Sequence, residues 1–75
     1  MENDVRINAR GLSAPGPRLM AEALLAKGRP EMLRVVVSNR VAADDVRAYL
    51  ETTGAAVEID HVGTEFHVLA RFAGD

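Results

Sequence analysis

The sequence predicts an α/β fold of the α+β two-layer type, in which two helices cover one face of a mixed four-stranded sheet. Three observations predict it: four short apolar or alternating runs indicate strands, two longer segments have helical spacing, and the six segments follow the order β-α-β-α-β-β. Because strand–helix–strand crossovers are right-handed and leave their flanking strands parallel, both helices are expected on the same face of the sheet.

Two strands are predicted in the first half of the chain. The stretch DVRINA, residues 4–9, alternates apolar and polar side chains, with Val5 and Ile7 on one face. The stretch MLRVVVS, residues 32–38, is a nearly continuous apolar run, which is typical of a strand paired on both sides. We therefore expect the second of these strands in the interior of the sheet.

The first helix is predicted between these strands, from Pro15 or Pro17 to Lys27. Proline is tolerated in the first turn of a helix, and Gly28 is a natural C-terminal stop. The expected buried stripe joins apolar side chains at helical spacing, namely Leu19, Met20, Ala23 and Leu24, with the stem of Lys27.

The second helix is predicted over 41–53, after a turn at NRV and before Gly54. Asp44 and Asp45 are expected in its first turns, where the helix dipole favours acidic side chains. Its apolar stripe consists of Ala42, Val46, Tyr49, Leu50 and Thr53.

The chain closes with a predicted hairpin, in which AVEIDHV and EFHVLARF are joined by a short turn at residues 63–64. With the turn centred there, Ile59 faces Val68 and Val57 faces Ala70, so the apolar residues share one face. The opposite, exposed face of the sheet is expected to carry polar residues, namely Arg6, Glu58, Asp60, His67 and Arg71.

Composition narrows the class of protein. The 75 residues predict a single domain, 1–75, and the apolar fraction of 48% with a net charge of −2 predicts a folded chain. No apolar run approaches the ~20 residues that span a membrane, and the acidic N-terminus lacks the features of a signal peptide, so we expect a cytoplasmic protein. The absence of cysteine excludes disulfides and thiolate metal sites. An isoelectric point of about 5.6 argues against direct binding of nucleic acid.

The segment between the first strand and the first helix, ARGLSAPGPRLM, carries a recognisable pattern. Together with the element order, INARGLSAPGP resembles the TusA/SirA/YedF family of small sulfur-carrier proteins, whose members have an Arg-Gly-Leu turn followed by Cys-Pro-x-Pro. Residues 10–12 match the turn, Pro15 and Pro17 match the two prolines, and Ala14 stands where the family has its cysteine. The resemblance extends from about Val5 to Phe72, and its later part looks like the YedF-type branch.

The resemblance implies a sulfurtransferase scaffold whose reactive atom is absent. In the family, a helix N-terminus lowers the pKa of the cysteine, and the thiolate accepts a persulfide sulfur. Ala14 carries no sulfur, so no catalytic residue, cofactor or metal site is predicted, and the chain as written is not expected to be an enzyme. Ser38 is a second departure, since relatives often have an acidic residue before the following Asn. The residues that the resemblance assigns to partner binding are Arg10, Gly11, Leu12, Ala14, Pro15, Pro17, Arg18 and Asn39.

Three functions remain open from the sequence. We favour a thiol-less relative that binds partners in sulfur or selenium trafficking, such as a cysteine desulfurase or another sulfur-relay protein, because no tag or other foreign sequence is visible. The second is a genuine carrier whose cysteine was changed to Ala14, which the codon in the native gene would reveal. The third is a regulatory domain that binds an anion at the helix start with help from Arg18.

Other reactive sites are not predicted. Ser13 has no base within its segment, so a turn or capping role is expected. A phosphate loop would require G-x-x-x-x-G-K-[ST], and Pro17 follows Gly16 instead. His61 and His67 are expected on opposite faces of the hairpin, paired or solvated, rather than as metal ligands. Three apolar residues are not readily buried, namely Leu12, Val62 and Leu69.

Overall fold

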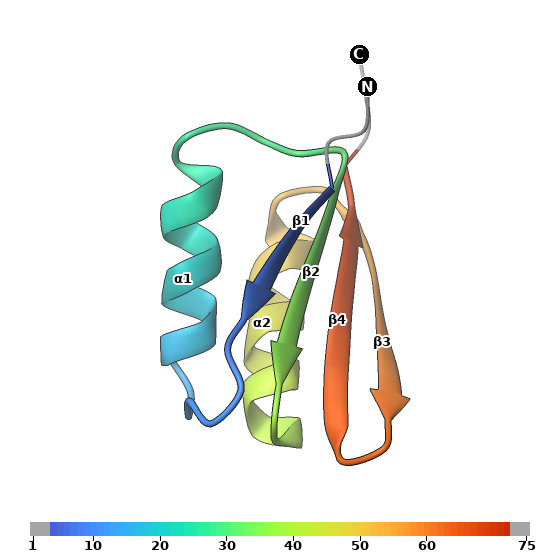
Figure 1. Cartoon of the computed structure of the whole chain (residues 1–75). Helices are drawn as coiled ribbons and strands as arrows, with labels where there is room; N and C mark the ends of the chain where they lie inside the picture. Colours follow the sequence, from blue (N-terminus) through green and yellow to red (C-terminus); the bar gives the residue numbers. More distant parts are fainter. Residues whose placement is uncertain (1–3, 73–75) are drawn as a thin grey trace.

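The structure, a computed structural model, describes residues 4–72 and confirms the predicted class and order of elements. Figure 1 shows two layers, a four-stranded sheet with both helices behind one of its faces. The elements are β1 (Asp4–Asn8), α1 (Gly16–Leu25), β2 (Met32–Val37), α2 (Arg40–Thr52), β3 (Ala56–Val62) and β4 (Glu65–Arg71).

The strands lie in the order β1-β2-β4-β3. β1 and β2 are parallel, whereas β4 is antiparallel to both β2 and β3. The chain therefore passes from β2 through α2 to the far edge, and the hairpin returns β4 to the interior. Both interior strands have apolar side chains toward the helices, and these meet α2 in a core that includes Leu33, Val35, Val37, Val46, Leu50, Val68 and Ala70, all fully buried.

The predicted hairpin register is confirmed. Val57 pairs with Ala70, and Ile59 pairs with Val68. On the opposite face, Asp60 pairs with His67, as the alternation predicts.

The predicted buried stripe of α1 is confirmed for Leu24 and wrong for its other members. Leu19 and Met20 are 51% and 39% exposed, and Ala23 is exposed as well. The helix instead turns Pro17 and Ala21 into the core, with Leu24 and Leu25 half-buried below them. Positions 17, 21, 24 and 25 follow the helical repeat as well as the predicted set does, so spacing alone does not distinguish the two faces. The small side chain of Ala21 lets the helix lie close to its neighbours, and this favours the observed face.

The predicted apolar stripe of α2 is confirmed in its fully buried members. The predicted placement of acidic side chains at the start of this helix is wrong. Ala42, Val46 and Leu50 are fully buried, and Tyr49 and Thr53 are half-buried. The first helical turn contains no acid, because the helix begins at Arg40 and places Asp44 in the second turn. The Asn39 side chain caps the helix by accepting a hydrogen bond of 2.8 Å from the Ala42 amide.

Within the described residues, no helix has the length and apolar character needed to cross a membrane.

Two leucines test the corrected packing. Replacing the fully buried Leu50 by alanine is expected to reduce the free energy of unfolding by about 2–5 kcal/mol, because it leaves a cavity between α2 and the sheet. Leu19→Ala on α1 is the matched control and should change it by less than about 0.5 kcal/mol. Urea unfolding followed by circular dichroism measures both, and a large loss at Leu19 would restore the original assignment of the α1 face.

Candidate functional site

The segment that carries the motif lies at the end of the sheet where β1 and β2 finish. Figure 1 shows that both helices begin at this end and that the β3–β4 turn lies there too. Ala9 is fully buried, and its amide donates to the Val36 carbonyl at 2.8 Å, which extends the pairing of β1. The backbone then turns, with the Leu12 amide donating to the Ala9 carbonyl at 3.2 Å. Gly11 lies at φ +81°, a left-handed conformation that favours glycine.

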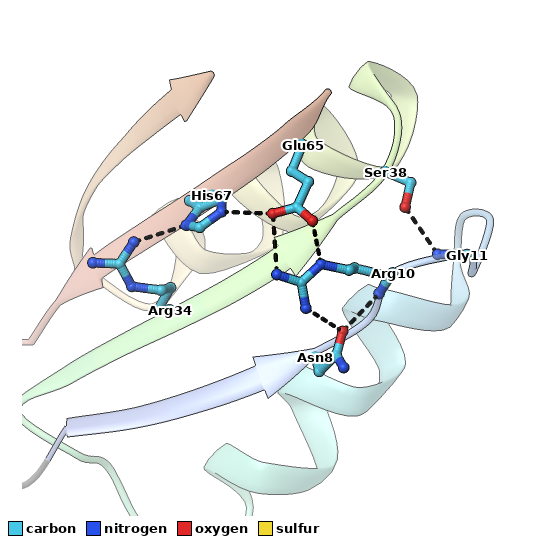
Figure 2. Close-up of polar contacts among 7 residues, drawn as sticks. All are labelled: Asn8, Arg10, Gly11, Arg34, Ser38, Glu65 and His67. Atoms are coloured by element: carbon cyan, nitrogen blue, oxygen red, sulfur yellow. Dashed lines mark hydrogen bonds and ion pairs between the residues drawn. The ribbon is translucent and has the colours of Figure 1, made fainter. Parts of the chain in front are cut away.

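Arg10 joins this turn to the hairpin, as Figure 2 shows. Its Nη2 donates to Glu65 Oε1 at 3.0 Å, and its Nε donates to Glu65 Oε2 in a bidentate ion pair. Its Nη1 and its backbone amide both donate to Asn8 Oδ1, at 3.1 and 3.2 Å. The guanidinium is thus held from two sides, and with it the start of the turn.

Glu65 is the centre of a longer polar chain across the sheet (Figure 2). His67 Nε2 lies 3.2 Å from Glu65 Oε1, and Arg34 Nη1 lies 2.8 Å from His67 Nδ1. Because Arg34 is always a donor, Nδ1 accepts and Nε2 carries the proton of a neutral imidazole. Hydrogen bonds from Arg10 and then His67 lower the pKa of Glu65 from 4.5 to about 2.

The second loop of the site is tied to the first. The Gly11 amide donates to Ser38 Oγ at 2.9 Å. The next residue is Asn39, whose side chain caps α2. The serine that departs from the family pattern therefore fixes the turn by a neutral hydrogen bond.

The start of α1 contains Ala14 in a half-exposed position, and the Ala14–Pro15 peptide bond is cis. The Gly16 amide donates to the Ser13 carbonyl at 2.9 Å, so the predicted turn role of Ser13 is confirmed for its backbone. No side chain caps α1, so the predicted capping role is wrong. Pro15 and Pro17 contribute no N–H groups, which leaves few backbone donors for an anion.

Arg18 is held by two carboxylates. Its Nη1 lies 2.5 Å from Glu22 Oε2, and its Nε lies 3.0 Å from Asp45 Oδ2. The second contact connects α1 to α2. Because both acids neutralise the guanidinium, the geometry disfavours the alternative in which Arg18 holds an anion at the helix start.

An apolar strip follows the motif along α1. Leu12, Leu19 and Met20 are 42%, 51% and 39% exposed. The Leu12 side chain lies beside Gly16, since a Cβ built there would be 3.6 Å from Leu12 Cβ. Leu19 and Met20 are three and four residues beyond Gly16, on the same face of the helix. We call these three residues the α1 strip.

The two histidines do not converge on a ligand. His61 stacks on Phe66 with ring centroids 4.3 Å apart, on the helix side as predicted. His67 lies on the other face and is buried, at 7% exposure, so it is paired rather than solvated. Among residues 4–72 there is no group of three or more His, Cys, Asp or Glu side chains placed to hold a metal ion.

The structure brings most of the predicted motif residues to one end of the molecule, and it adds residues that the sequence analysis did not assign to the site. Glu65 and His67 appear in the sequence as ordinary alternating positions of a strand. Asp45 appears as a helix-start acid. The signal that could have identified Glu65 is its place next to the predicted turn, since the start of β4 returns to the end of the sheet where Arg10 lies.

Comparisons with known proteins agree with this geometry. A family model described as sulfurtransferase TusA matches residues 5–71. The crystal structure of a SirA-like protein from Desulfitobacterium hafniense superposes with a TM-score of 0.80, at 23% identity, over 95% of this chain and 99% of that one. That likeness supports the fold. No curated protein matches the chain.

The Arg10–Glu65 pair predicts a pH dependence of stability. The folded state keeps Glu65 charged down to pH about 2, whereas the unfolded chain binds the proton near pH 4.5. The unfolded state therefore binds more protons between these values, and the stabilisation, complete above pH 4.5, is lost as the pH falls toward 2.

Urea unfolding of the native chain and of Glu65→Gln measures this effect. We expect the variant to be less stable at neutral pH and equal in stability near pH 2. Asp60→Asn is the control, because Asp60 is an exposed acid without an ion pair among the described residues. A deficit in the Gln variant that persists undiminished at low pH would contradict the assignment.

Proposed function

The chain belongs to the TusA sulfurtransferase family, and from that premise we propose that it is a docking module for partners in sulfur or selenium trafficking that carries no sulfur itself. One observation carries the proposal: the motif segment, residues 10–18, is held by side chains from three other parts of the chain, while the position of the reactive thiol holds Ala14. The side chains that hold this segment are present, whereas none of the 75 residues is a cysteine that could carry sulfur.

The surface available to a partner lies on and beside the loop. The α1 strip is apolar and exposed, and Ala14 is half-exposed at its end. Exposed contiguous apolar side chains favour protein contacts, since burial of their area against a partner is stabilising. A cysteine desulfurase or another sulfur-relay protein is the occupant that family membership favours.

The native chain is expected to bind a cysteine desulfurase without modification. In a titration of the ¹⁵N-labelled chain, amides of residues 10–20 should shift. Leu19→Asp should weaken binding about tenfold, because it places a charge in the apolar strip. Val62→Asp is the matched control, since Val62 is 50% exposed but lies on the hairpin, on the other face of the sheet. An unperturbed spectrum at saturating desulfurase would exclude this partner.

Restoring the thiol separates loss of chemistry from loss of docking. Ala14→Cys, incubated with a cysteine desulfurase and cysteine, is expected to gain a sulfur atom, about 32 Da by mass spectrometry. In that transfer the introduced thiolate attacks the outer sulfur of the donor persulfide, a new S–S bond forms, and the donor thiolate leaves.

Ser13→Cys is the control for an exposed thiol one residue away. Preferential modification at position 14 supports a docking surface that still aligns the motif. Equal modification of both variants, or of neither, would mean that the donor does not recognise this loop, which would contradict the proposal.

A further inference from the structure

The face of the sheet opposite the helices is uncovered and charged. We call it the open face. Apart from the Arg10–Glu65 pair, its charged residues are Asp4, Arg6, Arg34, Glu58, Asp60 and Arg71, of which all but the half-buried Arg34 are exposed. Within residues 4–72 none of the six belongs to an ion pair. Three acids and three arginines give this face a net charge of zero.

The side of the open face that is basic changes from one row of residues to the next. In the register of the sheet, Arg6 of β1 lies beside Arg34 of β2, Leu69 of β4 follows, and Glu58 of β3 ends the row. The row one step away runs through Asp4, Met32, Arg71 and Ala56. One edge of the first row is therefore basic and the other acidic, with an apolar side chain between them.

Two hollows lie over these rows, one on each side of the open face. One has a volume of about 120 Å³ and is lined by Asp4, Arg6, Met32 and Arg34, with Val5. The other has a volume of about 190 Å³ and is lined by Ala56, Glu58, Leu69 and Arg71, with Val57. The first hollow thus combines Arg6 and Arg34 with Asp4, and the second combines Glu58 with Arg71.

We propose that the open face binds the open face of a second copy, related by a two-fold axis that runs nearly along the strands. Such an axis places β1 of one copy over β3 of the other and brings the two unlike hollows together. Arg6 then faces Glu58 of the second copy, and Asn8 faces Asp60. Asp4 comes to lie beside Arg71 of the second copy. Because the axis is two-fold, every one of these contacts occurs twice.

The charge pattern selects this arrangement over the others. An axis across the strands at the row of Arg6 would lay each strand over its own copy, with Arg6 over Arg6 and Glu58 over Glu58, and like charges in contact are costly. A polyanion would meet three carboxylates on the same face. With the axis along the strands, Arg6 faces an acid of the second copy and Asp4 lies beside an arginine, and neither alternative provides both contacts.

The size of the face sets the strength of the interaction. Four strands about 4.8 Å apart and six residues at about 3.3 Å cover about 400 Å² in projection. Stable complexes bury about 800 Å² on each partner, so we expect a weak dimer. The α1 strip remains free, because α1 lies behind the sheet (Figure 1), so the dimer presents two copies of it.

Sedimentation equilibrium of the full chain up to about 1 mM tests the dimer. No sulfur-transfer partner is present in this experiment, so a failure to dimerise would not bear on the proposed docking function. The native chain should dimerise, and added salt should weaken the dimer. Arg6→Glu and Glu58→Arg should each raise the dimer Kd about tenfold or more, since each creates two like-charge contacts. Lys27→Glu makes the same charge change as Arg6→Glu at an exposed position after α1 and should leave association unchanged.

Mixing the two defective variants gives the sharpest result. Arg6 and Glu58 lie on opposite edges of one sheet, so they do not meet within a chain. Equal amounts of Arg6→Glu and Glu58→Arg should form a mixed dimer as strong as the native one, because each supplies the charge that the other lacks. A monomer at every concentration, or a mixture that fails to associate, would overturn the proposal. Spectral shifts of the open face with a poly-glutamate peptide but not with protein concentration would instead assign it to an acidic partner.

Discussion

The bidentate contact between Arg10 and Glu65 joins two residues that are 55 positions apart. Glu65 begins β4, the strand that pairs with both β2 and β3, so the contact ties the motif turn to the interior of the sheet. The same carboxylate accepts from His67, which in turn accepts from Arg34. One acidic side chain therefore orders both the loop at the end of the sheet and part of the surface along it.

This polar chain also explains how a sheet with helices on one face buries apolar side chains on the other. Val36 lies on the open face, in register with His67, yet it is fully buried. His67 and Arg34 lie beside it, and the aliphatic stem of an arginine covers apolar surface while its charged end stays hydrated. The network thus serves as a thin polar layer where a second layer of helices would otherwise lie. Side chains with partners in such a layer do not require burial by another protein, whereas Arg6, Glu58 and Arg71 have no ion pair among the described residues.

The sequence was sufficient for the fold and for the location of the motif, and insufficient for the contacts that fix the motif. Strand alternation and the Gly63 turn determined the hairpin register, because a one-residue slip would have moved Ile59 and Val68 off the core face. The stripe of α1 was mispredicted because the helix has apolar residues on several faces, and hydropathy favours Leu19 over Ala21 where packing requires the smaller residue. Contacts such as Arg18–Asp45 depend on the distance between two helices, which no local pattern contains.

The residues that hold the motif loop are different from Ala14, the residue at the position of the family's thiol. Glu65 and Ser38 hold the turn by binding Arg10 and the Gly11 amide, and Asp45 holds the start of α1 by binding Arg18. None of these contacts involves the side chain at position 14. A carrier's thiol must reach into another protein, so the fold keeps that position half-exposed and leaves it out of the core. An alanine in place of a cysteine at this position lacks only the SH group and breaks none of these contacts, while the α1 strip remains exposed. The proposed docking function therefore requires the exposed surface beside this position and no further structural element.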